Sequence, residues 1–379
     1  MKALPLDGIR VIELGSTVAA PAAARLLADF GADVVKIEPP EGDHLRRWGE
    51  LAPDGTSWWF KSHNRNKSFV CLDLRQRDDR LRARELILGA DAVIENFRPG
   101  VMAGWGMGYA ELAAEHPGLI YVSISGYGQD GPKAERPGFG HIAEGISGFR
   151  YVTGYEDRPP VRVGLSVGDE IAALYAAFGT LAALQARRRD GRGDHIDVSL
   201  VEGLFSLSEA LLPEYAHAGR VTERAGNRYL RAAPSGIYTT ADGRHLSIAA
   251  NSEPIFRRLC AAMGQEGTAA DPRFATNQAR IGHSAALDDI ISAWAGARAL
   301  EPALAILAAA GVPAGPVNSI ADIVADPHFQ ARGAIAEVSS DDGDRIATPG
   351  LVPRLRNHPG RLAHAARAVG ADQHRVDER

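Results

Sequence analysis

The sequence predicts an α/β fold, with a large domain built on a mostly parallel sheet and a smaller α+β domain. Three observations carry this prediction. Apolar strand-like runs alternate with helical segments through the first 125 residues. A hairpin pattern follows much later, near residue 240. The length of 379 residues and the hydrophobic content of 45% describe a globular protein of about two domains.

The first 125 residues contain the strands of the expected parallel sheet. The predicted strands cover 9–14, 33–38, 69–74, 92–97 and 119–125, and helical segments cover 21–30, 77–88 and 109–115. Pro21 opens the first helix and Gly31 follows its end, which are the usual positions of these residue types. Because strand and helix alternate, the strands are expected to run parallel with helices covering the sheet.

A long helix rich in small residues is expected to follow Asp169 and to extend to Leu184. Apolar residues recur at helical spacing and alanines fill much of the rest, which predicts a helix buried almost all round against a sheet or another subunit. Asp169 is expected at its N-cap. A carboxylate there either caps the helix by accepting amide hydrogen bonds, or acts as a nucleophile that is held still and shielded from water. Taken alone, this stretch favours capping.

The chain after residue 205 is expected to form a linker and a second domain. Residues 235–240 and 245–250 are predicted strands joined by a turn at Asp242 and Gly243, and helices follow them. The predicted boundaries are a large domain over 1–205, a linker over 206–230, a small α+β domain over 231–318, and a linker and return to the large domain over 319–379.

Composition and charge argue against several functions. The net charge of -5 and the lack of a recognisable motif give no indication of nucleic-acid binding. We find no signal peptide and no apolar run of membrane-spanning length, and therefore expect a cytoplasmic protein without a membrane partner. Cys71 and Cys260 are too few and too far apart for a zinc site or a disulfide framework. We therefore expect reduced thiols and no metal site.

The loops at the carboxyl ends of the strands are the candidate site, because ligands of parallel sheets bind there. The loop 15–21 lacks both the glycine spacing of a dinucleotide fingerprint and a Gly-Lys-Ser/Thr phosphate loop, which disfavours a nicotinamide cofactor and a P-loop ATPase. Four basic residues are expected near this edge: Arg65, Lys67, Arg75 and Arg98. A phosphate-bearing ligand and solvated surface charges explain them about equally well.

Several motifs follow one another along almost the whole chain. They are, in order, 21–39, 64–67 with 72–74, 95–100, 124–132, 168–169, 191–200 and 241–243. No single motif is decisive, but their order and spacing together are specific. Together they resemble the family III CoA-transferases, the CaiB–BaiF family.

The resemblance implies that Asp169 is the catalytic nucleophile and that the strand-end loops hold coenzyme A, as a substrate and not as a permanently bound cofactor. The implied CoA contacts come from three segments: Val18 and Ala19; Leu72, Asp73, Leu74 and Arg75; and Asn96, Phe97 and Arg98. The fold implied by the resemblance is an interlaced ring-shaped homodimer, in which each chain has a Rossmann-like large domain and a small domain.

The implied reaction moves CoA from an acyl-CoA donor to a carboxylic acid through an aspartyl anhydride and an aspartyl-CoA thioester on Asp169. Because each step exchanges one activated acyl group for another, positioning and exclusion of water should dominate catalysis. Analogy with the family favours a small dicarboxylate acceptor. Arg224, Arg228 and Arg231 are candidate partners of its carboxylate, although a solvated loop explains at least two of them better.

Departures from the family keep two other functions open. The α-methylacyl-CoA racemases share the fold and the aspartate, but they need a histidine at the position where this chain aligns Phe139. Phe139, Gly140 and His141 are expected near the acyl substrate, and Glu253 resembles an acid of the racemases, so racemisation is the second interpretation. A third is a non-catalytic acyl-CoA-binding subunit, against which the intact Asp169 argues.

Overall fold

The chain forms two compact units in a computed structural model that describes residues 3–376. The first unit comprises Met1–Phe149, Val163–Gly219 and Pro327–Arg379, and the second comprises Arg150–Arg162 and Arg220–Asp326. The chain therefore passes between the units four times. Residues 150–162, which the predicted boundaries place in the large domain, group with the second unit.

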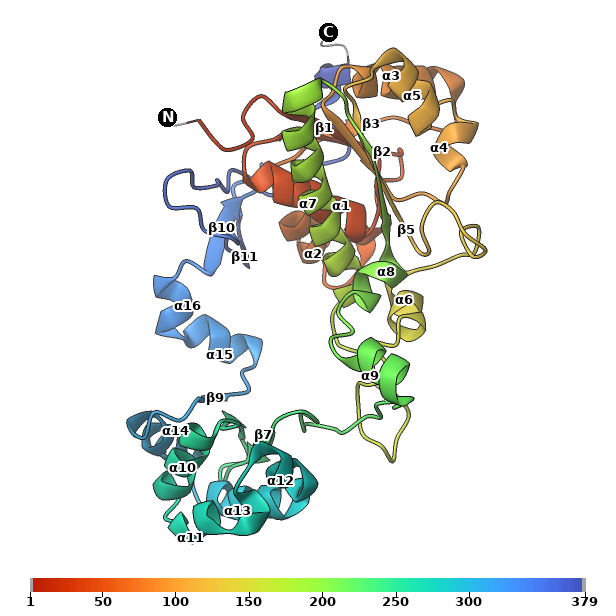
Figure 1. The fold of residues 1–379 in the computed structure, drawn as a ribbon. Helices are drawn as coiled ribbons and strands as arrows, with labels where there is room; N and C mark the ends of the chain where they lie inside the picture. The colour runs from red at the N-terminus through yellow and green to blue at the C-terminus, as the bar shows by residue number, and fades with distance from the viewer. Residues whose placement is uncertain (1–2, 377–379) are drawn as a thin grey trace. The chain divides into compact units, whose positions relative to one another are not determined.

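A six-stranded parallel sheet forms the centre of the first unit (Figure 1). Its strands are β1 (Arg10–Glu13), β2 (Asp33–Glu38), β3 (Ser68–Cys71), β4 (Ala92–Glu95), β5 (Ile120–Ser125) and β6 (His195–Ser199). All neighbouring strands pair in parallel in the order β3-β2-β1-β4-β5-β6. The predicted parallel sheet is thus confirmed. The strand order reverses between β1 and β4, which is where ligands bind in open sheets of this kind.

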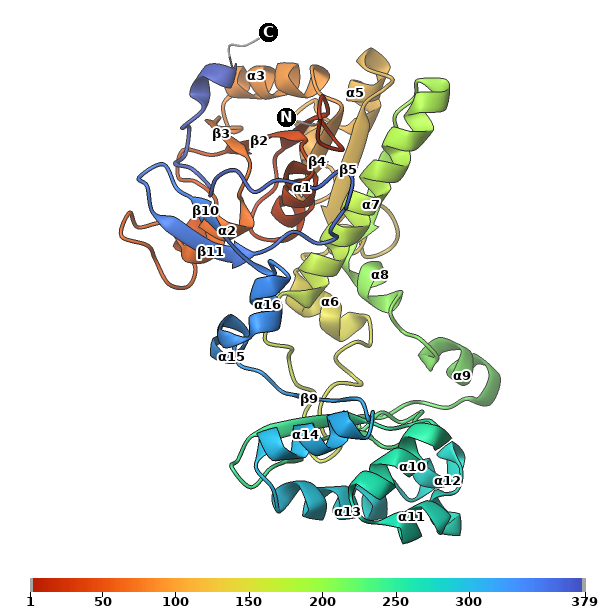
Figure 2. The ribbon, with the colours of Figure 1, turned by 90° about the vertical axis from the view of Figure 1, so that its left-hand side faces the viewer.

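Helices cover both faces of this sheet (Figure 2). Val11 points to one face, where α1 (Ala19–Asp29) and α7 (Val167–Asp190) pack. Ile12 points to the other face, where α3 (Arg77–Leu88) and α5 (Tyr109–Glu115) pack. Successive strand residues alternate between faces, so a sheet covered on both sides requires the continuous apolar strands seen in the sequence.

Shorter elements complete the first unit. The helices are η1 (His44–Arg47), α2 (Trp58–His63), α4 (Val101–Gly104), α6 (Gly140–Ile146), α8 (Leu200–Phe205), α9 (Leu211–Ala218), α16 (Pro327–Ala331) and η3 (Gln373–Val376). Two further strands, β10 (Ile335–Ser339) and β11 (Arg345–Pro349), form an antiparallel pair. The segment after residue 327 therefore returns to the first unit.

Within the described chain, α7 is buried on one face rather than almost all round, and burial of the other face against another subunit stays a prediction. Its alanine face packs closely against α1 and the sheet. Leu174, Phe178 and Leu181 recur on the opposite side at the spacing of helix turns and are exposed, Phe178 to 70%. The apolar periodicity of the helix sequence indicates two apolar faces, but only one of them is covered within the described chain.

The expectation that no segment has the length of a membrane span also needs correction. Among the described residues, α7 is long and apolar enough to cross a membrane, and the bent pair of α13 (Ser284–Gly296) and α14 (Leu300–Ala309) passes the same test when taken together. A core helix can have the same length and composition as a span. The buried alanines of α7 lie in the core of the first unit.

The second unit has its own small sheet and core. The predicted hairpin is confirmed, because β7 (Ser235–Thr239) and β8 (His245–Ala249) pair antiparallel, and β9 (Ala314–Pro316) adds a third strand beside β8. Besides α13 and α14, its helices are α10 (Glu253–Ala262), α11 (Glu266–Ala270), η2 (Pro272–Phe274), α12 (Asn277–Gly282) and α15 (Ile320–Ala325). Leu246, Phe256 and Ile291 belong to its separate apolar core.

Candidate functional site

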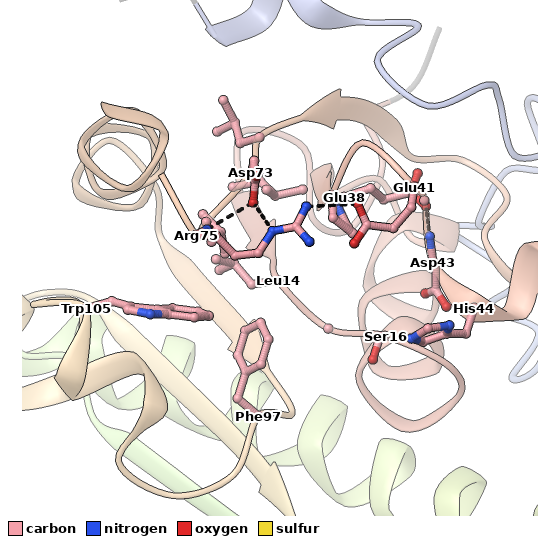
Figure 3. Close-up of a pocket in the computed structure, with 16 residues that line it drawn as sticks. Leu14, Ser16, Glu38, Glu41, Asp43, His44, Asp73, Arg75, Phe97 and Trp105 are labelled. Atoms are coloured by element: carbon pink, nitrogen blue, oxygen red, sulfur yellow. Dashed lines mark hydrogen bonds and ion pairs between the residues drawn. The ribbon is translucent and has the colours of Figure 1, made fainter. Parts of the chain in front are cut away.

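A cavity of about 250 Å³ lies at the carboxyl edge of the sheet, among the loops that follow β1 to β4 (Figure 3). Its walls are formed by Leu14, Gly15, Ser16, Ile37, Glu38, Pro39, Glu41, Gly42, Asp43, His44, Leu72, Asp73, Leu74, Arg75, Phe97 and Trp105. Ligands of open parallel sheets bind at this edge. The cavity is therefore the candidate ligand site of the first unit.

Five of the nine residues predicted to contact CoA line this cavity: Leu72, Asp73, Leu74, Arg75 and Phe97. The other four do not line it. Val18 and Ala19 are buried. Asn96 is bonded to the loop after β1, and Arg98 is exposed beyond the end of β4.

The loop after β2 contributes Glu41, Gly42, Asp43 and His44, which the sequence analysis missed. The sequence did contain a signal for this loop. The rule that placed the site in the loops after β1, β3, β4 and β5 applies equally to β2, which ends at Glu38, whereas no residue of the loop after β5 lines this cavity. Trp105 was also missed. It meets Phe97 edge to face with ring centroids 5.2 Å apart, and the two rings form an apolar wall (Figure 3).

Each carboxylate of the cavity wall is paired with a cation. Glu38 binds Arg46 (Oε2 to Nη2, 2.6 Å), and Asp43 lies 3.1 Å from the ammonium of Lys36. Asp73 and Glu41 both pair with Arg75, at 2.6 and 3.1 Å (Figure 3). The Arg75 pairs are exposed, and such pairs contribute little stability. Arg75 can therefore exchange these partners for an incoming phosphate at little cost.

The predicted basic cluster is wrong for two of its four members. Arg65 is buried and forms a bidentate pair with Asp29, at 3.0 and 2.7 Å. Lys67 is also buried and donates to Glu13 and Asn64, both at 2.7 Å. Buried cations need such partners, because an unpaired charge inside a protein is very costly. Arg65 and Lys67 thus stabilise the fold and do not meet a ligand.

The loop after β1 is held by polar side chains from other elements. Lys36 Nζ donates to the carbonyl oxygen of Gly15 (2.7 Å), and the Asn96 side chain both accepts from and donates to the backbone of Ser16, each at 2.9 Å. Thr17 has a left-handed φ of 70°, a strained conformation for a β-branched residue. Its N–H donates to both oxygens of Asp43, at 3.0 and 3.1 Å.

The ionisation of Asp43 follows from the same contacts. Burial would raise the pKa of this carboxyl, but the ammonium of Lys36 and the N–H groups of Leu45 and Thr17 outweigh burial and lower its pKa. Burial would likewise lower the pKa of Lys36, yet the carboxylates of Glu13 and Asp43 hold it above its usual value. The pair is therefore charged and keeps the loop in its strained form.

Glu95, at the end of β4, has the opposite environment. Burial raises the pKa of this carboxyl to about 7, although Ser123 and the N–H of Phe97 donate hydrogen bonds to it and lower the pKa. Ser123 Oγ lies 3.0 Å from His195 Nε2. A hydrogen-bonded chain thus runs from the loop of Phe97 through β5 to β6.

Asp169 lies in the first turn of α7, which begins at Val167 with Ser166 at the N-cap. The prediction that Asp169 is the N-cap residue is therefore wrong by three positions. Its side chain is half-buried and lies against Gly140, the first residue of α6. A β-carbon added at Gly140 would lie 2.9 Å from the carboxyl carbon, so only glycine fits beside the carboxylate.

The three predicted substrate residues lie at the start of α6. Gly140 is buried against Asp169, Phe139 is 72% exposed, and His141, the second residue of the helix, is also exposed. Gly168 packs against the backbone of Gly140 as well. The structure thus brings Asp169 together with Gly140 and leaves the Phe139 side chain in solvent.

The candidate residues of the second unit are engaged within that unit. Arg224 donates to the carbonyl oxygens of Tyr155 (3.2 Å) and Tyr151 (3.0 Å), and Arg228 pairs with Asp288 at 3.3 Å. Arg231 also has a partner. The remaining candidate, Glu253, accepts hydrogen bonds from Arg280 (3.3 Å) and from the N–H of Asn277 (3.1 Å).

Similarity to known proteins extends over almost the whole chain. The sequence profile of CoA-transferase family III matches residues 6–373. A Succinyl-CoA–D-citramalate CoA-transferase of Chloroflexus aurantiacus is 45% identical over 367 residues, which are 97% of this chain and 91% of the relative. A Succinate–glutarate CoA-transferase of Agrobacterium fabrum is 38% identical over 354 residues, 92% of this chain and 88% of the relative. The crystal structure of a CAIB/BAIF family protein from Brucella suis superimposes with a TM-score of 0.88 at 34% identity, covering 99% of both chains.

Proposed function

The chain belongs to CoA-transferase family III, and we propose that it transfers CoA from an acyl-CoA to a small dicarboxylic acid through the carboxylate of Asp169. The substrates named for the two relatives above are succinyl-CoA, citramalate, succinate and glutarate. An acceptor of four to six carbons with two carboxylates fits these names. The observation that carries the proposal is the half-buried carboxylate of Asp169, which only a glycine neighbour allows to lie at the start of α6.

The proposed reaction has four balanced steps. Asp169 attacks the donor thioester carbonyl, which forms an aspartyl anhydride and releases CoA thiolate. The thiolate attacks the aspartyl carbonyl, which forms an aspartyl-CoA thioester and releases the donor acid. The acceptor carboxylate attacks this thioester and forms a second anhydride, again releasing the thiolate. Attack of the thiolate on the acceptor acyl carbon then gives the new acyl-CoA and restores the carboxylate.

The side chains of the first unit support this chemistry by positioning rather than by acid or base catalysis. Each step exchanges one activated acyl group for another, so the main requirements are alignment of the reacting groups and exclusion of water. Close packing of Asp169 against Gly140, and of Gly168 against the same backbone and Leu204, limits the space for water beside the nucleophile.

We place CoA along the cavity at the carboxyl edge of the sheet. In this proposal Arg75 and Arg98 bind its phosphates, and the wall of Phe97 and Trp105 contacts an apolar part of the molecule. The protein acts as an interlaced homodimer in the cytoplasm, and the exposed side chains of α7, including Phe178, are covered by the second copy.

The decisive experiment is the intact mass of the protein after mixing with succinyl-CoA or glutaryl-CoA and rapid quenching. We expect an adduct of acyl or CoA mass on the peptide that contains Asp169, and its loss on treatment with hydroxylamine. Asp169→Asn should form no adduct and no product. The matched control is Glu202→Gln, which also removes a carboxylate from the first turn of a helix in the first unit and should behave as the wild type.

The acceptor class is tested with matched acids in the same assay. Succinate and glutarate should accept CoA, whereas butyrate and valerate, which lack the second carboxylate, should accept it poorly. Turnover by Asp169→Asn would overturn the nucleophile assignment. Exchange of the α-proton of an acyl-CoA without any adduct would instead indicate a racemase. Equal use of the monocarboxylates would overturn the proposed acceptor class.

A further inference from the structure

His63, at the end of α2, holds the last residue of the loop after β1. Its ring is buried, and Nε2 lies 3.1 Å from the carbonyl oxygen of Val18. Val18 is the N-cap of α1, and the same carbonyl accepts the first hydrogen bond of that helix from Ala22 at 2.8 Å. Trp59, one turn earlier in α2, packs edge-on against the ring with centroids 6.3 Å apart. The ring is therefore fixed from two sides.

The protonation of His63 follows from its surroundings. Burial, together with the nearby charges of Arg25, Lys67 and Lys36, lowers the pKa of this imidazole to about 3, although the hydrogen bond to Val18 raises it. The ring is thus neutral. Because a carbonyl oxygen can only accept, the single ring proton belongs to Nε2.

The other ring nitrogen of His63 faces the helix that carries the nucleophile. Nδ1 lies 3.8 Å from Oε1 of Glu170, the residue that follows Asp169 in the first turn of α7. The second oxygen of Glu170 lies 3.8 Å from the guanidinium of Arg25 on α1. Neutral Nδ1 has no proton to donate, and 3.8 Å exceeds hydrogen-bond distance, so the ring lies between the loop after β1 and the turn that carries Asp169 without bonding to that turn.

We propose that His63 is a positioning residue that aligns the loop 15–18 with the first turn of α7, so that CoA bound at the loop meets Asp169. The inference rests on the proposed function for the identity of the ligand. Lys36, Asn96 and Asp43 hold the three preceding residues of the loop, and His63 is the only one of the four anchors that also faces α7. Loss of this bond frees the N-cap of α1 and leaves the rest of the loop anchored.

The test compares three variants of the full-length protein. His63→Leu removes the hydrogen bond but keeps an apolar group of similar size. His63→Gln can place an amide nitrogen near the position of Nε2 and donate to the same carbonyl. The matched control is Ser62→Ala, from the same helix, because Ser62 contacts Thr348 and not the loop. The measurements are Kd for free CoA, KM and kcat with the acyl-CoA donor, and hydrogen exchange of the peptide covering residues 14–20.

We expect His63→Leu to raise Kd for CoA by about tenfold, the loss expected for one buried hydrogen bond. Exchange of the 14–20 peptide should be faster. His63→Gln should return both quantities close to the wild-type values, and Ser62→Ala should change neither. A residue that only stabilised the fold would lower the melting temperature without changing Kd. Unchanged Kd and exchange in His63→Leu would overturn the inference.

A failure of the inference about His63 can be told apart from a failure of the proposed function. If the wild type does not bind CoA, the proposed function fails, whereas the exchange of residues 14–20 still reports on the anchor. If His63→Leu does not fold, His63→Asn replaces it. Its amide is one bond shorter and lies near Nδ1 instead of Nε2, so Gln but not Asn should restore CoA binding. Equal binding by Gln and Asn would contradict the inference.

Discussion

At Gly140, one methyl group would change where the carboxylate of Asp169 lies, which we propose is the nucleophile. A β-carbon there would overlap the Asp169 carboxylate, and an aspartate side chain can rotate away more easily than a helix can move. We expect Gly140→Ala to lower kcat by about 100-fold, as for an ångström-scale displacement of a reacting group. Steady-state kinetics measures kcat, and thermal unfolding measures the stability of the variant. Gly145→Ala is the control, because the same helix leaves open space there, and equal losses in both variants would contradict this explanation.

Glu95 should make the stability of the protein depend on pH. Its pKa is about 7 in the folded chain, raised by burial from 4.5, so the folded state keeps a proton that the unfolded state has lost. The contribution of Glu95 to the free energy of unfolding is fully present below pH 4.5. It falls by about 3 kcal/mol in total as the pH rises to 7. Above pH 7 it stays low.

Glu95→Gln removes this titration and keeps an acceptor for Phe97. Urea unfolding of both proteins at pH 5 and pH 8 measures the effect. We expect the free energy of unfolding of the variant, relative to the wild type, to be higher at pH 8 than at pH 5. Taking the difference between the two proteins cancels other groups such as His63, whose lowered pKa gives the opposite slope as the solution becomes acidic. The same difference at both pH values would show that Glu95 is already ionised at pH 5.

Among the elements, α7 has the most roles. Its first turn carries Asp169, its alanine face packs against α1, and its exposed face presents Leu174, Phe178 and Leu181. Exposed apolar stripes of this kind mark protein interfaces, and the proposed partner is a second copy.

The double variant Phe178→Glu with Leu181→Glu tests the role of this stripe. The wild type should scatter light as twice the chain mass of 40.4 kDa at micromolar concentration. The variant should show the mass of one chain, because desolvating two carboxylates opposes association. Leu81→Glu, at a half-exposed position of α3, is the control and should leave the mass unchanged. A monomeric wild type would refute the proposed dimer.

At the scale of the whole molecule, segment 150–162 belongs to the second unit although both flanking segments belong to the first. Arg224 explains this arrangement. Its guanidinium donates to the carbonyl oxygens of Tyr151 and Tyr155 and lies over the Tyr151 ring, 5.5 Å from its centroid. The N–H of Gly226 adds a bond to the carbonyl oxygen of Gly154 (2.8 Å).

Arg224→Leu should release this segment. We expect limited trypsin digestion to cut within 150–162 several times faster than in the wild type, with little change in the first unit, because opening of a loop is governed by its local contacts. Arg158→Leu provides the comparison, because the Arg158 side chain pairs with its neighbour Asp157 and lies over the Tyr155 ring, both within the segment itself. The Arg158 change also removes a cleavage site, so rates are compared at Arg150 and Arg162. Similar cleavage of wild type and Arg224→Leu would show that other contacts hold the segment.

Local sequence pattern was sufficient for the parallel sheet, for helices such as α3 and α5, and for the hairpin of β7 and β8. Each of these depends on apolar periodicity and on residues close together in the chain. The strand-end rule placed the candidate site in the loops that follow the strands, and the family resemblance singled out Leu72 to Arg75 and Phe97, which line the cavity. The motif match singled out Asp169, whereas its helix alone favoured capping.

Only the tertiary structure decided which polar side chains are free to meet a ligand. Arg65 and Lys67 have the composition of a phosphate site, but Asp29 and Glu13, distant in sequence, bind them in the interior. The exposed face of α7 could not be told from its buried face, because both are apolar and periodicity does not show which one is covered. His63 carried no signal in the sequence. Its proposed role depends on Val18 and Glu170, which chain folding brings to opposite sides of one ring.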